Sequence, residues 1–543
     1  MKKLLSVVFA FALMFAALPL QIFAEEAEYI SFCGNDDIPA NITEIAIGTG
    51  DAYGRTKDKM ESVGIDPEKA YFNLKREPVD IKELWQKLPK LEKISIVRSN
   101  VKNAAYFAKF RKLTTLELYD CKGISNLQFA PNCKGLTEFA YTCEGLSDIS
   151  EIGKMKQLKK LTIADATTYE YIGSDFIELQ KKVIDGNYLC DLTPLENLTN
   201  LTELTVEGAA VEDITPILNM PKLTKFTLSN AVKTDLSPLE KLDDLKSFTF
   251  SVSGKRFIKE SGHYGCITIP ALKKLSNLSL SGGSFYDDSL FGLTGLKTLE
   301  LKGCVIENRD EKYQYNGKKL PKLETLQLYG SEIADKTISQ FDSVKKLTVS
   351  KCIIRNVTVP KAYDDSKYSS YNYSLNYLKN FKYLEKLTVW NCKISDISGL
   401  KNLVKLKYLD LSDNYIKDIT PLEKLENLKT LNISGANSYD KYGNDFLEPL
   451  RNLKTLENLD ISWIYDSFEY EDSSGNIDMW KPGTENSVFG IVSSLPELKS
   501  LTVSALTEYG YTMEEENNAR KKLFEEKMPY CEINTVYPVV SCQ

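Results

Sequence analysis

The chain has 543 residues, of which 68 are Lys or Arg and 75 are Asp or Glu, so its formal net charge is −7. With 43% hydrophobic residues it has the composition of a soluble globular protein, and its acidic balance argues against binding of nucleic acid through phosphate neutralisation. A single histidine nearly excludes histidine-based metal sites and acid–base relays. We therefore expect no cofactor, no metal ion and no nucleic-acid partner.

The first 24 residues have the features of a secretory signal peptide. Lys2 and Lys3 precede an apolar stretch from Leu4 to Leu18, and Ala24 is a small residue suited to cleavage. The alternative is an uncleaved N-terminal anchor. No later apolar run is long enough for a membrane-spanning helix. We expect a protein that is secreted or loosely associated with the cell surface, with no integral membrane segment after cleavage.

Most of the chain repeats one unit with the pattern LxxLxLxx. Many successive starts, such as Leu91 and Leu113, lie 22 residues apart, which makes the period real. The sixteen starts are Leu91, Leu113, Leu136, Leu158, Leu201, Leu223, Leu245, Leu275, Leu296, Leu323, Val344, Leu384, Leu406, Leu428, Leu456 and Leu498. The LxL part predicts a short strand with alternate residues inside, and an earlier strand near Ile42–Ile47 begins the array.

The segment that returns from each strand to the next is too short for a full helix. In four units it contains a proline three residues after an aspartate, and these prolines are Pro194, Pro216, Pro238 and Pro421. A short polar side chain followed by a residue of fixed φ favours a tight turn or a 3₁₀-helix. We expect such pieces on the convex side of the repeat array.

These segments read DLTPLENLTNL from Asp191, DITPILNMPKL from Asp213 and DITPLEKLENL from Asp418. The chain thereby resembles the leucine-rich repeat proteins, specifically the bacterial type with 22-residue repeats that internalins typify. The resemblance covers about residues 42–506. It implies an α/β solenoid, a leucine-rich repeat horseshoe with a long parallel β-sheet on the concave face, a 3₁₀ or extended convex side and capped ends.

Together, these features divide the chain into four parts. The signal peptide covers residues 1–24, the N-terminal cap and first irregular repeat 25–90, the solenoid with rim insertions 91–506, and a cap of helix and strand 507–543. The capping box from Thr512 to Glu515 predicts the start of that helix. Because repeat arrays need capped ends, a helix and strand there fit the expected fold.

The eleven cysteines fall into two groups. Four stand at the position after LxLxx where the related proteins usually carry Asn, a position that Asn414 keeps; they are Cys121, Cys304, Cys352 and Cys392. We interpret these four as buried structural thiols. The others are disulfide candidates, with Cys133–Cys143 and Cys531–Cys542 as local pairs, but the sequence decides neither the connectivity nor whether any disulfide forms.

Insertions interrupt the repeat at seven places, each just after a strand. They are 50–79, 167–187, 253–265, 307–319, 356–377, 437–445 and 463–490, and several are rich in Tyr, Ser, Asn and Asp. Insertions at the same phase of a solenoid emerge on the same edge, so we expect them to line one rim of the sheet. Their composition suits binding loops, although simple spacers would look similar.

Most outward residues of the predicted strands are Thr or Ser, which suit any exposed strand. One region differs, because aromatic and acidic side chains face outward there near two Tyr-rich insertions. Exposed Trp and Tyr are frequent at binding hot spots and also stack on sugars. The predicted partner-binding residues are Tyr329, Trp390, Tyr408, Asp410, Asp413, Tyr371 and Tyr373.

These features predict a non-enzymatic, monomeric recognition protein that binds a protein or peptide on its concave face and rim. One alternative is a carbohydrate-binding protein that uses Tyr329, Trp390 and Tyr408 as stacking platforms. Another is a structural component of a surface layer. A catalytic or zinc site would have to rest on His263 and Cys266, which no further ligand accompanies nearby in the sequence.

Overall fold

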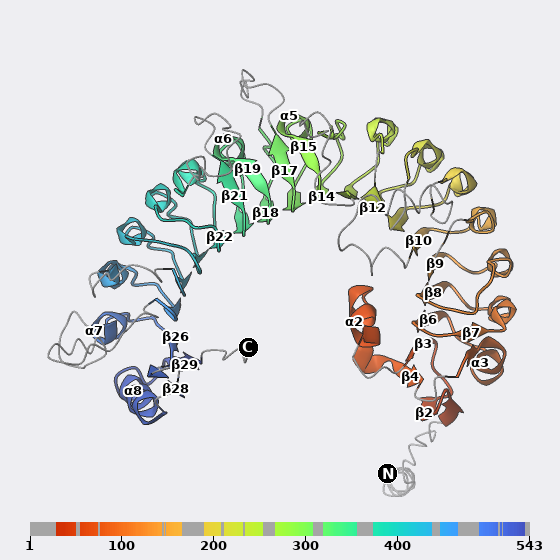
Figure 1. Ribbon diagram of the computed structural model, residues 1–543, viewed down its shortest axis with the longest axis horizontal. Helices are drawn as coiled ribbons and strands as arrows, with labels where there is room; N and C mark the ends of the chain where they lie inside the picture. Colours follow the sequence, from red (N-terminus) through yellow and green to blue (C-terminus); the bar gives the residue numbers. More distant parts are fainter. Residues whose placement is uncertain are drawn as a thin grey trace, which may run out of the picture. The chain divides into compact units, whose positions relative to one another are not determined.

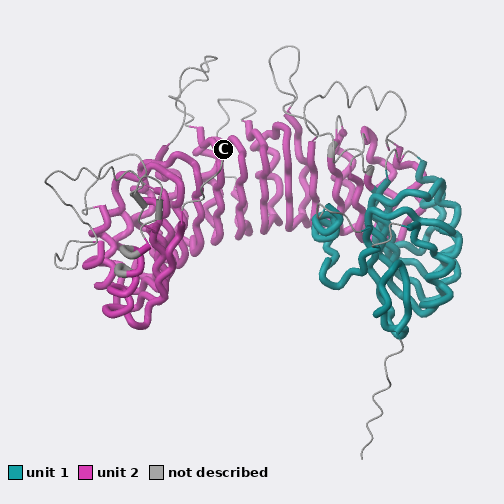
Figure 2. The backbone as a smooth tube through the Cα atoms, turned by 60° about the horizontal axis from the view of Figure 1, so that its bottom comes forward, with its two compact units in different colours: residues 1–144, 148–163 teal, residues 145–147, 164–543 magenta. Residues whose placement is uncertain are grey.

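The computed structural model describes residues 29–49, 55–73, 77–143, 146, 148–165, 189, 191–207, 211–231, 234–252, 266–307, 319–355, 373–436, 446–464, 488–505, 507–508, 511–512 and 514–537. The chain forms two compact units (Figure 2): unit 1 contains residues 1–144 and 148–163, and unit 2 contains residues 145–147 and 164–543. The predicted signal peptide lies outside the described residues.

Unit 1 begins with an antiparallel pair, β1 (Tyr29–Phe32) and β2 (Asn35–Pro39). Its parallel sheet contains β3 (Glu44–Thr49), β4 (Tyr71–Asn73), β6 (Lys93–Val97), β8 (Thr115–Tyr119), β9 (Glu138–Cys143) and β10 (Lys160–Asp165). The short strands β5 (Val79–Asp80) and β7 (Val101–Lys102) form a separate pair. The helices are α2 (Arg55–Ser62), η1 (Pro67–Lys69), α3 (Ile81–Lys87), η2 (Ala104–Lys109), η3 (Ala130–Asn132) and η4 (Ile152–Lys154).

The segment from α2 to β4 covers the concave side of the unit 1 sheet, where Figure 1 shows α2 beside β3 and β6. Met60 of α2 packs in one buried cluster with Val97, Tyr119 and Ala140, which the strands present on that side. Gly48 of β3 leaves room for the helix, because a Cβ atom there would lie 2.5 Å from Met60 Cε. The prediction that insertion 50–79 lines a rim is therefore wrong for its described part, which packs on the sheet itself.

Unit 2 contains a parallel sheet in which each repeat contributes one strand. Its strands are β11 (Glu203–Glu207), β12 (Lys225–Ala231), β13 (Ser247–Val252), β14 (Asn277–Ser281), β16 (Thr298–Lys302), β18 (Thr325–Tyr329), β20 (Lys346–Ser350), β22 (Lys386–Trp390), β23 (Tyr408–Asp410), β24 (Thr430–Asn432), β25 (Asn458–Asp460), β26 (Ser500–Ser504) and β29 (Glu532–Val536). Each of the sixteen predicted strand positions, counted across both units, is a strand of the structure.

The core of unit 2 is a stack of the leucines that the repeat pattern places inside. Leu387, Leu409 and Leu431 occupy equivalent positions on neighbouring strands and are completely buried. The register keeps them together, because one residue of slippage would turn every one of them to the solvent. The repeat period therefore decides both the strand order and the content of the core.

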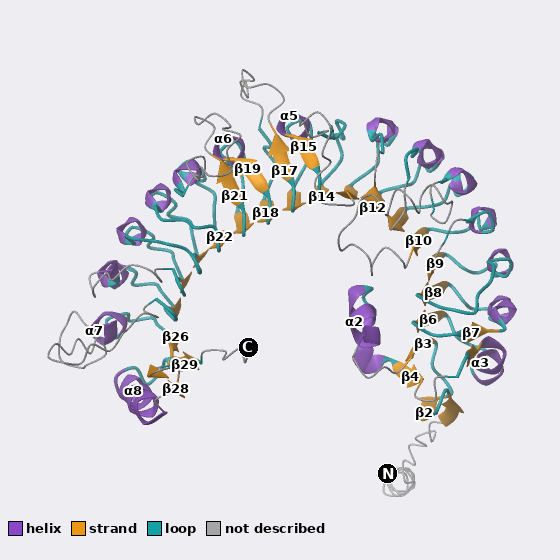
Figure 3. Cartoon of the chain, in the orientation of Figure 1, coloured by secondary structure: helices purple, strands orange, loops and turns teal. Residues whose placement is uncertain are grey.

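Short helices run along the side opposite the sheet strands of unit 2 (Figure 3). They are η6 (Thr193–Leu195), η7 (Thr215–Asn219), η8 (Ser237–Lys241), α5 (Asp287–Leu290), α6 (Asp335–Ile338), η10 (Asn376–Leu378), η11 (Ser398–Leu400), η12 (Thr420–Leu422), η14 (Glu448–Asn452) and α7 (Val488–Val492). The repeat aspartates act as predicted: Asp418 Oδ1 accepts a hydrogen bond from the Thr420 amide at 2.8 Å, at the start of η12. The prediction of an α/β solenoid with a leucine-rich repeat fold is confirmed.

Unit 2 has two further features. A second parallel sheet follows the main strands in its middle repeats and consists of β15 (Ser284–Tyr286), β17 (Val305–Glu307), β19 (Glu332–Ala334) and β21 (Ile353–Arg355). Near the C-terminus, β27 (Thr507–Glu508) and β28 (Tyr511–Thr512) form a hairpin, and α8 (Glu514–Lys527) packs Phe524 against Phe489, with ring centroids 5.1 Å apart. Because β29 continues the sheet beyond β26, helix and strand together close this end of the core.

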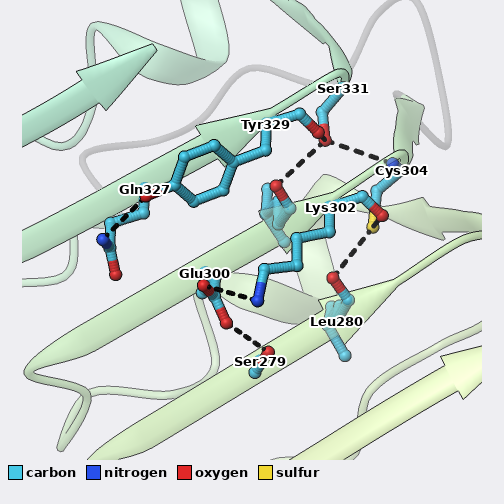
Figure 4. Close-up of polar contacts among 9 residues, drawn as sticks. Ser279, Leu280, Glu300, Lys302, Cys304, Gln327, Tyr329 and Ser331 are labelled. Atoms are coloured by element: carbon cyan, nitrogen blue, oxygen red, sulfur yellow. Dashed lines mark hydrogen bonds and ion pairs between the residues drawn. The ribbon is translucent and has the colours of Figure 1, made fainter. Parts of the chain in front are cut away.

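In several turns a buried Asn, Cys or Ser side chain forms hydrogen bonds to the backbone of neighbouring repeats, and we call this row of side chains the ladder. Asn414 is fully buried; its Oδ1 accepts from the Cys392 and Ile394 amides at 3.1 and 3.0 Å, and its Nδ2 donates to Val389 O at 2.7 Å. Cys304 takes the equivalent place and donates its thiol to Leu280 O at 3.3 Å, beside Ser331 (Figure 4). Burial raises the pKa of the Cys304 thiol to about 12.

The four ladder cysteines are all buried, which confirms the structural interpretation. Cys133 and Cys143 are not joined by a disulfide, so that local pair does not form, and Cys542 of the other pair lies outside the described residues. Among the residues that the structure describes, none of the helices combines the length and the apolar character of a membrane span.

Candidate functional site

The concave face of unit 2 has a hydroxyl-bearing half and a half with charged and aromatic groups. On β11–β14 the middle outward row consists of Thr205, Thr227, Thr249 and Ser279. From β16 onward the same row continues in register as Glu300, Gln327, Thr348, Thr388, Asp410, Asn432 and Asp460. In this middle row only the second half carries ionised side chains, and the outward aromatic residues Tyr329, Trp390 and Tyr408 lie on its strands. This half therefore has the residue types that suit recognition.

Trp390 ends β22 and faces outward, half-buried. Its indole Nε1 donates a hydrogen bond to Asp413 Oδ2 at 2.6 Å, and Lys351 Nζ lies 4.7 Å from its ring centroid. Asp413 follows β23 with a left-handed backbone (φ 54°), which directs its carboxylate back across the neighbouring strand. The indole ring is therefore held by an acceptor on its edge and a cation on its face.

Tyr408 begins β23 and is also half-buried. Lys386, its partner in the register, places Nζ 4.2 Å from the Tyr408 ring centroid. Burial, and secondly the Asp410 carboxylate, raise the pKa of the Tyr408 hydroxyl, so the residue is a neutral hydrogen-bonding group at neutral pH.

Tyr329 ends β18 in the same outward row as Trp390. The register runs from Tyr329 through Ser350 to Trp390, so the two aromatic residues stand two strands, or about 10 Å, apart with a small residue between them. Gln327 Nε2 donates to Tyr329 Oη at 3.0 Å and fixes the ring along the strand (Figure 4).

Two outward carboxylates are held in place by serines two residues later. Asp410 Oδ1 accepts from the Ser412 amide at 3.1 Å and from its hydroxyl at 2.6 Å. Asp460 is held in the same way by Ser462, at 2.9 and 2.7 Å. In both groups one oxygen is engaged within its own repeat, which fixes the direction of the other oxygen.

The structure brings together only part of the predicted site. Trp390, Asp413 and Tyr329 lie at the carboxyl ends of their strands, whereas Tyr408 lies at the opposite edge, about 13 Å along the strand direction from the level of Trp390. Asp410 lies between these two levels, in register with Thr388. The predicted patch therefore extends across the width of the sheet.

Of the two tyrosines predicted from an insertion, the structure describes only Tyr373. Tyr371 lies outside the described residues. The Tyr373 carbonyl accepts from the Ser395 amide at 2.8 Å, just before η10, so Tyr373 belongs to the segment that leads to the helices opposite the sheet. Most residues of the other predicted rim insertions also lie outside the described residues.

The sequence interpretation omitted Lys346, Lys351 and Lys386, which lie on or beside β20 and β22. Lys346 and Lys386 occupy outward positions two residues before the middle row, so the alternation of the strands would have identified them. The serines that hold the carboxylates were also identifiable, because Asp410-Leu411-Ser412 and Asp460-Ile461-Ser462 repeat one pattern.

The arrangement offers ionic, aromatic and hydrogen-bonding contacts. Within the described part of the chain, no three His, Cys, Asp or Glu side chains are grouped so as to hold a metal ion. His263 lies outside the described residues, and Cys266 lies in the segment before β14.

Comparison with known proteins identifies leucine-rich repeats in this part of the chain. The model of the family described as Leucine Rich repeats (2 copies) matches residues 382–424 and 404–464, which include Trp390 and Tyr408. No curated protein matches the chain. The matched repeats and the parallel sheet together show that the chain contains leucine-rich repeats and has their solenoid fold.

Two solved structures match the chain at low sequence identity. An internalin from Listeria monocytogenes str. 4b F2365 is 20% identical with a TM-score of 0.29, over 77% of this chain and 81% of that one. A leucine-rich repeat protein of Leptospira interrogans is 15% identical with a TM-score of 0.48, over 83% of this chain and 98% of that one.

Proposed function

We propose that this chain is a secreted, non-enzymatic and monomeric recognition protein that binds a protein or peptide on the concave face of unit 2. Leucine-rich repeat proteins generally mediate protein–protein recognition, and solenoids bind with extended concave surfaces. One observation carries the proposal: Trp390 stands half-exposed on this face, anchored by Asp413 and Lys351. A large aromatic ring held in advance in its bound orientation is typical of a binding hot spot.

The same geometry favours a protein partner over a carbohydrate. Stacking on a sugar needs a free ring face, but Lys351 lies over one face of Trp390 and Lys386 over one face of Tyr408. A protein partner can instead contact the ammonium groups, the indole edge and the carboxylates together. The N-terminal segment, with Lys2, Lys3 and its apolar stretch, supports export.

The test is a binding selection with the protein from Glu25 onward. The immobilised protein is exposed to a peptide display library and, separately, to a glycan array, beside the double variant Trp390→Ala, Tyr408→Ala. The control is Thr227→Ala, Thr249→Ala, which changes the same face on β12 and β13. Circular dichroism and thermal unfolding verify that both variants fold.

We expect peptide ligands whose binding falls at least about 10-fold in the aromatic variant and is unchanged in the control, as hot-spot truncation predicts. Equal binding by all three proteins would contradict recognition through this face. Glycan binding that is lost with Trp390, without peptide ligands, would favour the carbohydrate alternative. Self-association of the wild-type protein without a ligand would favour the surface-layer alternative.

A further inference from the structure

From β20 to β25 the outward charges of the unit 2 sheet change sign, from positive on β20 and β22 to negative on β23 and β25. Lys346, Lys351 and Lys386 lie on or beside β20 and β22, and Asp410, Asp413 and Asp460 lie on or beside β23 and β25. Lys346 and Lys386 are direct register partners, about 4.8 Å apart in the sheet, although like charges in such positions repel each other. The two groups of charge are therefore adjacent but separate.

Neither group is neutralised within the described residues. The lysines that directly precede β20 and β23 are ion-paired: Lys345 with Glu324 at 3.0 Å and Lys407 with Glu385 at 3.0 Å. In contrast, none of the three lysines and none of the three aspartates forms an ion pair between described residues. These six charged groups are therefore available to form ion pairs with a bound ligand.

The two aromatic residues lie between the groups and connect them. Lys351 lies over the Trp390 ring while Asp413 accepts the Trp390 indole hydrogen, and Lys386 lies over the Tyr408 ring beside Asp410. These contacts restrict the lysine side chains, so less rotamer entropy is lost when a ligand binds them. The concave face from β20 to β25 thus consists of a positive half, an aromatic middle and a negative half, with several side chains already held in place.

We propose that the concave face from β20 to β25 docks a protein segment with acidic side chains at one end and basic side chains at the other. This inference rests on the proposed function and adds the chemistry of the partner. A uniformly acidic chain would meet Asp410 and Asp460, and a uniformly basic one would meet Lys346 and Lys386, so only a bipolar segment satisfies both halves. The acidic end lies over β20 and β22.

The size of the face determines the length of the segment. Five strands, β20, β22, β23, β24 and β25, span four spacings of about 4.8 Å, or about 19 Å. An extended segment crosses this distance with about six residues, and a helix with about thirteen. A synthetic peptide of about 14 residues is therefore an adequate probe.

The test measures fluorescence anisotropy of four labelled peptides that share one length and the same neutral residues. One has a Glu block and a Lys block, one has the same residues in alternation, one has only Glu and one has only Lys. We expect the block peptide to bind at least about 10-fold more tightly than each of the others, with affinity falling as salt rises.

Charge reversal provides the matched variants. Lys346→Glu, Lys386→Glu should weaken binding of the block peptide at least about 10-fold, as should Asp410→Lys, Asp460→Lys, because each leaves one block opposite a like charge. The four substitutions together should restore binding, since the face is again bipolar. Lys225→Glu on β12 is the control, and it should leave binding unchanged.

Three results would overturn the inference. The block and alternating peptides could show no difference in affinity in titrations up to about 1 mM, a uniformly charged peptide could bind more tightly than the block peptide, or the fourfold variant could fail to regain binding of the block peptide. Its failure is distinguishable from failure of the proposed function. Peptides from the display selection could bind in a way that needs Trp390 but is unchanged by both charge reversals. This result would support the concave face as the binding surface and contradict the inference of a bipolar partner.

Discussion

The concave faces of the two units have opposite relations to the solvent. In unit 1, Val97, Tyr119 and Ala140 face outward from the sheet, and the segment from α2 to β4 buries them. In unit 2 the corresponding positions carry Ser350, Ser412 and the aromatic residues Tyr329 and Trp390, and no described helix packs on them in the way that α2 packs in unit 1. One repeat architecture thus gives a self-covered face in unit 1, where these outward residues are apolar, and in unit 2 a face of Ser, Tyr and Trp that no described helix covers.

The sharpest test of this comparison uses two tyrosines that end equivalent strands, Tyr119 on β8 and Tyr329 on β18. Tyr119 is only 7% exposed, so Tyr119→Ala should lower the free energy of unfolding by about 3–5 kcal/mol, as for a buried aromatic residue. Tyr329→Ala should cost about 1 kcal/mol or less. Urea denaturation measures both, and equal losses would show that the two faces do not differ in this way.

The ladder inside the turns should behave alike in both units, and Asn414 tests it. Asn414→Ala leaves the Cys392 and Ile394 amides without their acceptor, so we expect a loss on the order of 3 kcal/mol. Asn414→Cys should cost less, because cysteine fills this position at Cys304 and Cys121. Equal destabilisation by Ala and Cys, measured by urea denaturation, would contradict an interchangeable ladder.

A glycine beside the proposed recognition face should have a smaller effect. Gly435 has φ +61°, and a Cβ atom there would lie 2.7 Å from Asp413 Oδ1. Gly435→Ala should cost about 1–2 kcal/mol from the left-handed backbone and shift the tryptophan emission, since Asp413 holds Trp390.

Gly303→Ala is the matched control for Gly435, because its φ is +60° and nothing lies within 4 Å of its Cβ position. It should cost about 1 kcal/mol and leave the emission unchanged. An emission shift of the same size in both variants would disprove the coupling through Asp413.

The smallest effect concerns the ion pairs at the edge of the unit 2 sheet. Hydrogen bonds from Lys429 and Lys499 lower the pKa of Glu457 from 4.5 to about 2. A lowered pKa in the folded state means that the stabilisation is present above about pH 4.5 and is lost as the pH falls toward 2. The melting temperature of the wild-type protein should exceed that of Glu457→Gln slightly at pH 7, and the difference should vanish near pH 2. A difference that persists at pH 2 would contradict this account.

Periodicity explains how much of the fold could be predicted. The positions of the strands, the buried leucines and the Asp-capped 3₁₀-helices follow from residues within a single repeat, so local pattern sufficed. The residues of the predicted site that lie on strands, from Tyr329 to Asp410, do face outward for the same reason. Tyr373 does not join them, because an insertion has no period from which its direction could be read.

The covering of unit 1 and the pairing of Trp390 with Asp413 could not be predicted in this way. The first depends on the fit of Met60 against Gly48, Val97 and Tyr119, which come from three different strands. The second depends on the left-handed backbone at Asp413, which turns its carboxylate toward the preceding repeat. Both involve contacts between residues that are distant in sequence or whose orientation a turn decides.

The sequence by itself determined the repeat, the direction of each strand residue and the interior of the solenoid, because a period of about 22 residues leaves one way to bury the leucines. Only the tertiary structure decided which outward residues remain accessible and which charges remain unpaired. The exposure of a side chain and its ion pairs depend on which groups of the neighbouring strands, and in unit 1 of the segment from α2 to β4, lie next to it. Those distances exist only in the folded chain.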